Sequence, residues 1–363
     1  MSKQKKILHF HPNGNFAKVF VKPLIDAERS AGYISNIVTS TNSIAVSATE
    51  IAYDLALKNF FLLPYAFFQI FIIFSREAPD IVVTHNSKSS SLVLFSAWCA
   101  RVPVRIYFNH GVPYVGHGGF FKFILLFLER INLLLSTKVL TVSPDMMNLL
   151  RELDNTKSVN IVHHGSASGL DPSLFSSERY LKSPFRYANN IAENDYLAVY
   201  IGRAVKRKGF ELILKLWIQH FIDTKYKLVL CGPTESNVVN FLGFLPNNVR
   251  PLGFTDQVHD ILSQADILVL PSFHEGLSYA TLEAMASKCL VIANHIPGIN
   301  NLITHEFNGF LVENNDVNKY AEIITKIQSA TNSDLDIIRE NAFTTAKKYS
   351  REEFIPAYLL LLN

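Results

Sequence analysis

The chain has 363 residues, of which 34 are basic and 31 are acidic, and its pI is near 8.6. A chain of this length exceeds what one hydrophobic core usually fills, so we expect two domains. Hydrophobic residues make up 48% and charged residues 18% of the sequence, which excludes a disordered protein. The net charge of +3 is too small to indicate nucleic acid as a partner.

Three cysteines, Cys99, Cys231 and Cys289, lie far apart, and none belongs to a CxxC pair. This pattern predicts neither a disulfide framework nor a zinc site and is typical of a reducing cytosol. The first apolar run, residues 7–10, is too short for the core of a signal peptide. We therefore expect the chain to stay in the cytoplasm.

Short runs rich in isoleucine and valine alternate with helix-length segments along the chain. This alternation is typical of βαβ units in parallel sheets that are buried on both faces. It predicts an α/β protein with two doubly wound halves in series. The expected strands are Lys6–Phe10, Asn36–Thr39, Ile81–Thr84, Arg105–Phe108, Lys138–Val142, Tyr196–Ile201, Lys227–Cys231, Ile267–Leu270 and Leu290–Ala293.

A segment rich in Gly and Ser, residues 163–175, separates the two halves and is followed by a polar stretch. Such punctuation suits a hinge or linker. Residues 350–363 predict a helix with one apolar side, which would pack back onto the first half. We expect an N-terminal domain at 1–168, a C-terminal domain at 169–349 and the returning helix at 350–363.

The first half of the chain is basic. Residues 1–168 hold 16 basic and 10 acidic side chains, whereas the remainder holds 18 and 21, so the halves should have different partners. Two apolar stretches lie in this half, Phe60–Phe74 and Gly119–Leu135, and the first is short for a bilayer-spanning helix. Two interpretations stay open: buried core helices, or a helix in the bilayer surface with Lys and Arg at the headgroups.

Open α/β sheets bind ligands beyond the carboxyl ends of their strands, so chemistry is expected in the loops that follow strands. The first such loop is residues 11–15, where Gly14 would let the backbone approach a ligand closely. His110, followed by Gly111, stands after another strand and could reach into a cleft; His85 has a similar position. An ordinary turn and structural histidines are the alternatives.

A cationic turn follows the strand Tyr196–Ile201. Four basic residues lie within six positions between Gly202 and Gly209, where a helix is expected to start. Flexible glycines, helix N–H groups and cations together form an anion cradle. The alternative is a solvated basic turn.

Two glutamates flank an expected helix start near Ser278. Glu275 and Glu283 would stand about 12 Å apart on a continuous helix, which exceeds the roughly 5–9.5 Å between glycosidase carboxylates. They are therefore interpreted as two hydrogen-bond acceptors along one extended ligand, with helix N–H groups between them for a phosphate. A nucleotide sugar has this shape.

The run from Glu275-Gly-Leu to Glu283-Ala-Met-Ala resembles the E-x7-E signature of retaining GT-B glycosyltransferases of family 4. Residues 202–209, 165–171 and 265–272 agree with this family in order and spacing. The first half is similar to its bacterial capsular and O-antigen branch through residues 85–88, 101–105 and 109–111. The resemblance implies a GT-B fold: two Rossmann-like doubly wound domains that face each other across a cleft, with the C-terminal helix crossing back.

The resemblance also implies roles for individual residues. Arg203 and Lys208 would contact the donor diphosphate, and Glu283 would accept hydrogen bonds from the ribose. Glu275 would hold the transferred sugar, and His110 would lie near it. The implied site is therefore catalytic Glu275 and His110 with donor-binding Arg203, Lys208, Gly276, Leu277, Ser278, Glu283, Gly14 and Asn15.

The implied reaction moves a hexosyl or N-acetylhexosaminyl group from a nucleotide sugar, commonly a UDP-sugar, to a lipid-linked (undecaprenyl-diphosphate) saccharide in capsule or O-antigen synthesis. Its place would be the cytoplasmic face of the inner membrane, with peripheral contact. We expect no cofactor and no metal, because Arg203 and Lys208 would balance the leaving-group charge. Alternatives are a sugar-nucleotide epimerase of the same fold and a binding subunit without activity; an NAD dehydrogenase is excluded because GxGxxG is absent.

Overall fold

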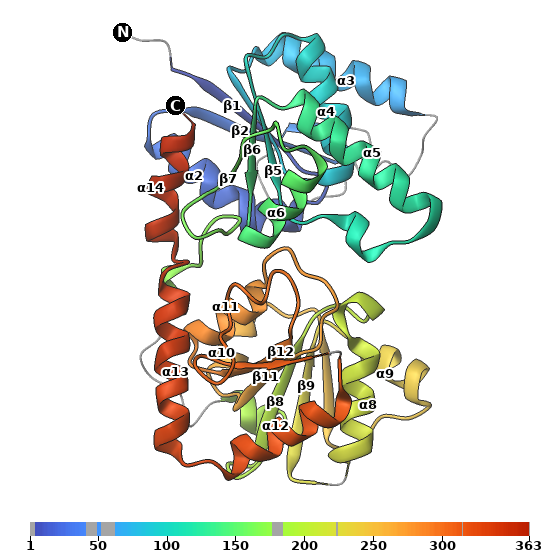
Figure 1. The fold of residues 1–363 in the computed structure, drawn as a ribbon, viewed down its shortest axis with the longest axis vertical. Coiled ribbons are helices and arrows are strands. Elements are labelled where there is room, and N and C mark those ends of the chain that lie inside the picture. Colours follow the sequence, from blue (N-terminus) through green and yellow to red (C-terminus); the bar gives the residue numbers. More distant parts are fainter. Residues whose placement is uncertain are drawn as a thin grey trace. The chain divides into compact units, whose positions relative to one another are not determined.

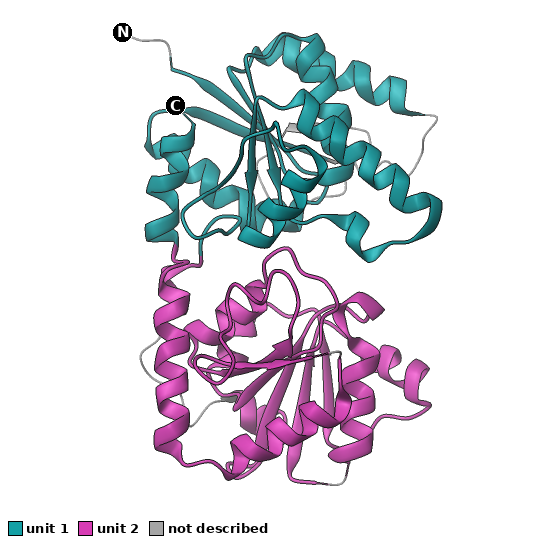
Figure 2. Cartoon of the chain, in the orientation of Figure 1, with its two compact units in different colours: residues 1–169, 351–363 teal, residues 170–350 magenta. Residues whose placement is uncertain are grey.

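The computed structural model describes residues 4–40, 49–51, 62–175, 184–222, 224–313 and 315–362. These divide into two compact units (Figure 2): unit 1 comprises residues 1–169 and 351–363, and unit 2 comprises residues 170–350. Unit 1 is thus discontinuous in sequence, because the end of the chain returns to it. Phe60 and Phe61, the start of the first apolar stretch, lie outside the described residues.

The described strands of unit 1 form one parallel sheet of seven strands (Figure 1). In spatial order they are β3 (Thr49–Ile51), β2 (Ile34–Ser40), β1 (Lys6–Phe10), β4 (Ile81–Thr84), β5 (Val104–Asn109), β6 (Lys138–Thr141) and β7 (Val159–Ile161). The order reverses between β1 and β4, where Phe10 pairs with Thr84. In open α/β sheets, ligands bind beyond the carboxyl ends of the strands at such a switch point.

Helices cover both faces of this sheet. On one face lie α3 (Leu63–Glu77), α4 (Ser87–Cys99) and α5 (Gly119–Leu135), and on the other α2 (Lys22–Ser30) packs beside α14 (Arg351–Leu361) (Figure 1). The remaining helical segments are α1 (Gly14–Phe16), the π-helix η1 (Ala17–Val21), the 3-10 turn η3 (Pro113–Gly116) and α6 (Pro144–Leu153). Ser143 caps α6 by accepting from the N–H of Met146.

Unit 2 repeats the plan with six described strands, all parallel. Their order is β10 (Val249–Gly253), β9 (Tyr226–Cys231), β8 (Tyr196–Ile201), β11 (Ile267–Leu270), β12 (Leu290–Asn294) and β13 (Phe310–Val312). The order reverses between β8 and β11. Its helical segments are η4 (Pro172–Leu174), α7 (Pro184–Ala188), η5 (Lys206–Lys208), α8 (Phe210–His220), α9 (Glu235–Leu242), α10 (Val258–Leu262), α11 (Tyr279–Ala286), α12 (Val317–Ser329) and α13 (Asn332–Lys347).

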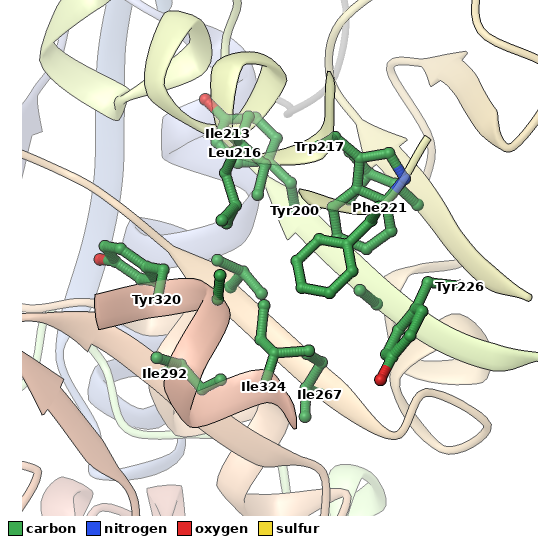
Figure 3. Packing of buried hydrophobic residues seen from close by; sticks show 14 of the residues in the cluster. Tyr200, Ile213, Leu216, Trp217, Phe221, Tyr226, Ile267, Ile292, Tyr320 and Ile324 are labelled. Carbon is green, nitrogen blue, oxygen red and sulfur yellow. The ribbon is translucent and has the colours of Figure 1, made fainter. Parts of the chain in front are cut away.

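The core of unit 2 lies between its sheet and the helices α8 and α12. Trp217 on α8 is fully buried beside Phe221, and Tyr320 and Ile324 enter from α12 (Figure 3). Strand residues such as Ile267 and Ile292 close the same cluster. Burying large side chains at about 25 cal/mol per Å² holds the strand ends, and the loops that follow them, in fixed positions.

The predicted strands form, and the strands that the pattern missed share one property. All four, β3, β7, β10 and β13, lie at the edges of the two sheets. The central strands are apolar on both faces, whereas β3, β7 and β13 have three residues each and β10 contains Arg250 and Pro251, so none of the four has a long apolar run.

The two apolar helices of unit 1 are each buried along one face only. In α3, Ala66, Ile70 and Phe74 are buried, while Tyr65 and Phe68 are exposed. In α5, one side carries buried residues and the other exposes a row of phenylalanines. Each helix therefore packs on the core with one face and presents an apolar face outward. No helix of the described residues is long and apolar enough to cross a bilayer.

Candidate functional site

In unit 2 the predicted donor-binding residues come from the two loops at the switch point. The loop after β8 runs from Gly202 through η5 to Gly209, and the loop after β11 runs from Pro271 to Ser278. Gly209 has φ +71°, and a Cβ there would lie 1.9 Å from the carbonyl oxygen of Pro271. Only glycine lets the two loops approach this closely.

Three interactions at neighbouring positions tie these loops together. The N–H of Phe273 donates to the carbonyl of Arg207 at 2.9 Å, and the Arg207 guanidinium donates to the carbonyl of His274 at 2.9 Å. The Nζ of Lys208 donates to Oε1 of Glu275 at 2.6 Å. Arg207 therefore holds the loop that carries Glu275, a structural role that the cationic composition of the turn did not reveal.

Lys208 and Glu275 form an ion pair that is largely shielded from solvent, with side-chain exposures of 21% and 8%. Arg203, by contrast, is exposed, and its carbonyl accepts from the hydroxyl of buried Tyr200. The turn thus offers one cation already matched to a carboxylate and another open to an incoming anion. Such an arrangement can bind a diphosphate by exchanging partners at Lys208.

Glu283 lies in the second turn of α11, five residues after Ser278. Burial raises its pKa from 4.5 to about 7, and no group among the described residues hydrogen-bonds its carboxylate. Its side chain is only partly exposed, so this acceptor gains hydrogen bonds when a ligand donates to it. This is the behaviour expected of a residue that binds sugar hydroxyls.

The start of α11 is shaped by Ser278 and Gly298. The Ser278 hydroxyl caps the helix by accepting from the N–H of Thr281 at 3.3 Å, and its own N–H donates to the carbonyl of Gly298 at 3.1 Å. Gly298 has φ +82°, and a Cβ there would lie 2.5 Å from the carbonyl oxygen of Glu275. Gly298 therefore supports the Glu275–Ser278 loop, in which Gly276 and Leu277 also lie, although no sequence motif marks it.

In unit 1 the predicted residues also follow strands of the sheet. Gly14 and Asn15 form the first turn after β1, which Asn13 caps by accepting from the N–H of Phe16 at 2.9 Å. The ring of His11 stacks on Phe16 at 4.0 Å, and burial lowers the pKa of His11 to about 4, so this ring is neutral. The turn is therefore ordered by its own side chains.

His110 stands directly after β5, in a loop shaped by a buried polar cluster. Asn109 accepts from the N–H of Gly111 at 2.9 Å and donates to Glu129 of α5 at 2.9 Å. The hydroxyls of Tyr107 and Ser87 donate to the same carboxylate. Burial raises the pKa of Glu129 to about 7 despite these bonds.

His110 also belongs to a row of histidines that the sequence pattern did not reveal. Its ring lies in hydrogen-bond contact with His85 at 3.0 Å, and His85 lies at 2.9 Å from His9 of β1. His9 in turn contacts the buried carboxylate of Glu28 at 2.9 Å. His85 was recognised by its position alone, whereas His9 and Glu28 carry no motif.

Two sheets of this topology, each with site residues at its switch point, define the two-domain GT-B fold of glycosyltransferases. Two family models match the chain: Glycosyl transferases group 1 over residues 182–344, and Glycosyl transferase 4-like domain over residues 52–164. The chain belongs to the group 1 glycosyltransferases, family 4, and is a transferase of class EC 2.4.

Known relatives agree with this assignment. The capsular polysaccharide biosynthesis glycosyltransferase CapM of Staphylococcus aureus is 25% identical over 71% of this chain and 70% of its own length. An Escherichia coli UDP-Gal:alpha-D-GlcNAc-diphosphoundecaprenol alpha-1,3-galactosyltransferase is 24% identical over 71% of this chain and 68% of its own.

Solved structures share the fold along nearly the whole chain. Sucrose-phosphate synthase from Thermosynechococcus elongatus superposes with a TM-score of 0.81 at 19% identity, covering 99% of this chain and 98% of that one. HepE from Anabaena, in complex with UDP-glucose, gives 0.78 at 16% identity, covering 98% and 99%. These likenesses establish the GT-B fold.

Proposed function

We propose that the protein is a retaining glycosyltransferase that moves a sugar from a nucleotide sugar to a hydroxyl of a lipid-linked saccharide in bacterial capsule or O-antigen synthesis. The observation that carries this proposal is the ion pair of Lys208 and Glu275 between the two switch-point loops of unit 2. UDP-sugars are the first candidates for the donor. The E. coli relative is named for UDP-galactose, and HepE was solved with UDP-glucose.

In this proposal unit 2 is the donor domain. Arg203 and Lys208 bind the diphosphate, and the first turn of α11 turns its N–H groups toward the phosphates. Glu283 accepts hydrogen bonds from the ribose, and Glu275, released from Lys208, holds the transferred sugar together with the backbone of residues 276–278. Each role uses a group that the fold already places at the carboxyl edge of the sheet.

The mechanism follows from where charge develops. Cleavage of the sugar–phosphate bond leaves negative charge on the diphosphate and positive charge on the sugar. Fixed cations stabilise that leaving group, and preorganised charges are commonly the largest contribution to catalysis. The acceptor hydroxyl attacks from the face that the leaving group vacates, so the anomeric configuration is retained. Because Arg203 and Lys208 supply the positive charge, the reaction proceeds without a metal ion.

Unit 1 is the proposed acceptor domain, and its outer face suits a membrane. The exposed apolar side chains of α3, α4 and α5 form what we term the aromatic surface: Tyr65, Phe68, Ile72, Phe95, Trp98, Phe120, Phe123 and Phe127. Adjacent helices in this row pack together, as α3 with α4 and α4 with α5. Arg76, Arg101, Lys122 and Arg130 are exposed on the same three helices or directly after them.

Aromatic rings with flanking cations fit an anionic bilayer surface. We therefore propose that the protein binds the cytoplasmic face of the inner membrane through this surface, where the lipid-linked acceptor resides.

The proposal is tested by donor binding and then by transfer. Wild-type protein and the Lys208→Ala variant are screened by thermal shift against UDP, GDP, ADP and CDP sugars, because a ligand that binds only the folded state raises the Tm. The sugars of one of these four nucleotides should raise the Tm of the wild-type protein but not that of the Lys208→Ala variant. The stabilising donor is then incubated with and without a prenyl-diphosphate saccharide. Conversion of the donor in the absence of acceptor would indicate an epimerase, and no stabilisation by any donor would contradict the proposal.

A further inference from the structure

Four side chains of unit 1 form a continuous row across neighbouring strands. Glu28 of α2 contacts His9 of β1, His9 contacts His85 after β4, and His85 contacts His110 after β5, at 2.9, 2.9 and 3.0 Å. The strand order β1-β4-β5 places the three histidines in this sequence, and Glu28 approaches from α2. Each ring hydrogen-bonds the next one in the row. The ring nitrogens do not surround a common point, and the described residues contain no cluster placed to hold a metal ion.

At the Glu28 end of the row, the direction of the hydrogen bond is fixed: Glu28 accepts and His9 donates. Its carboxylate accepts from the hydroxyl of Ser35 at 2.5 Å and from the hydroxyl of Tyr358 on α14 at 2.7 Å. Burial acts to raise the pKa of Glu28, but His9 and the two hydroxyls outweigh it and lower the pKa. The ionised carboxylate only accepts, so the Nε2 of His9 must carry a proton.

The donor and acceptor roles of all the rings in the row follow from that one proton. When His9 is neutral, its Nδ1 accepts from Nε2–H of His85, and the Nδ1 of His85 accepts from Nε2–H of His110. The Nδ1 of His110 then presents a lone pair, and it has no hydrogen-bond partner among the described residues. When His9 carries both protons, every bond reverses, and the Nδ1 of His110 presents an N–H instead.

The surroundings decide where an added proton rests. Burial lowers the pKa of His110 to about 3 and that of His85 well below its ordinary value. Phe16 and Phe108 pack against the His110 ring and carry no charge. The side chains that contact His9 are Glu28 and His85, and of these only Glu28 is an anion; the Tyr358 hydroxyl of α14 reaches Glu28.

We propose that Glu28, through His9 and His85, holds His110 in the tautomer that offers a hydrogen-bond acceptor to a bound hydroxyl, and passes a proton taken from that hydroxyl inward to rest on His9. The O–H bond of the hydroxyl breaks as an N–H bond forms at Nδ1 of His110. The Nε2 proton of His110 moves to Nδ1 of His85, and the Nε2 proton of His85 moves to Nδ1 of His9. The reverse path returns the proton to water after the product leaves. Glu28, His9 and His85 are thus positioning residues, and their link to catalysis rests on the proposed function.

The proposal can be tested by spectroscopy on the protein without substrate. In protein with ¹⁵N-labelled histidine, the spectra should show Nε2–H tautomers for His9, His85 and His110 at high pH. On acidification His9 should gain its second proton, and His85 and His110 should change to Nδ1–H at the same pH. Three rings that change at three different pH values, or a His110 that keeps its tautomer, would overturn the proposal.

Two variants should shift the pH of this transition in opposite directions. Glu28→Gln removes the anion beside His9, so the transition should fall by about 1–3 pH units. Tyr358→Phe keeps the ring that packs on Phe354 but removes one hydroxyl from the carboxylate, so the transition should rise. If Glu28→Gln does not fold, the shift in Tyr358→Phe decides alone. His220→Gln, at an exposed histidine of α8, is the matched control and should leave the spectra of the three rings unchanged.

Kinetics then links the row to turnover. Glu28→Gln should lower kcat about 10²-fold with little change in the donor KM, and the acid limb of the kcat profile should move with the spectroscopic transition. An acid limb that stays in place while the spectroscopic transition moves would overturn the catalytic role. If no donor supports transfer, the proposed function fails, whereas the spectra still decide whether the relay exists.

Discussion

Glu283 should destabilise the folded protein at neutral pH, and its replacement by Gln should therefore stabilise it. In the unfolded chain a glutamate loses its proton near pH 4.5, whereas folded Glu283 keeps its proton to about pH 7. Stability is thus lost as the pH rises between these two values, because the unfolded state releases the proton first. Each tenfold difference in acidity corresponds to about 1.4 kcal/mol, which sets an upper limit of about 3 kcal/mol.

The expected effect is smaller than this limit, because the side chain keeps some contact with solvent. We expect the Glu283→Gln variant to exceed the wild type in free energy of unfolding by about 2 kcal/mol more at pH 8 than at pH 5. Glu193→Gln, at an exposed position of unit 2, is the control and should show no such difference.

The assay can be confined to unit 2. The chain has two tryptophans, Trp98 on α4 of unit 1 and Trp217 in the core of unit 2. In a Trp98→Phe background, the fluorescence of Trp217 reports urea unfolding of unit 2 alone. Unfolding free energies of wild type and Glu283→Gln that change in parallel from pH 5 to pH 8 would refute the reasoning. The same variant should bind the donor at least tenfold more weakly, because the carboxylate that lowers the stability of the free protein is the group proposed to bind the donor.

Three further outcomes are expected. Lys208→Ala and Glu275→Ala should each lower kcat/KM by about 10²-fold or more without loss of the folded state, as measured by initial rates and circular dichroism; near-wild-type turnover in either variant would rule out the site. Transfer activity should survive EDTA, and a loss that Mg²⁺ restores would show that a metal takes part. Replacing Phe120, Phe123 and Phe127 together by Ser should reduce sedimentation with anionic vesicles at least tenfold, with activity on a water-soluble acceptor retained; unchanged sedimentation would count against the aromatic surface as the membrane contact.

The sequence predicted the parts of the fold that are buried on both sides. Strands β1, β4, β8 and β11 have the bounds expected from their continuous apolar runs, and they are the strands at the two switch points. The edge strands were missed because three of them have only three residues and the fourth, β10, carries Arg250 and Pro251. A pattern of hydrophobic residues indicates which segments are buried, so it does not identify segments that are only partly buried.

The candidate site was predicted unevenly for a similar reason. Loop residues such as Lys208 and Glu275 stand out because glycines and charges gather there. His9 and Glu28 do not, since one interrupts an apolar strand and the other is one charge among several on the polar-looking helix α2. Their importance comes from contacts between positions far apart in the chain, which spacing does not encode.

The return of the chain to unit 1 has a consequence for how the protein is made. Glu28 is synthesised early, yet one of its hydroxyl donors, Tyr358, emerges some three hundred residues later. While unit 2 is still being translated, the earlier unit holds a buried acid that lacks this donor. Unit 1 therefore reaches its finished state only after α14 has left the ribosome, so a product truncated before Tyr358 keeps an incomplete first unit.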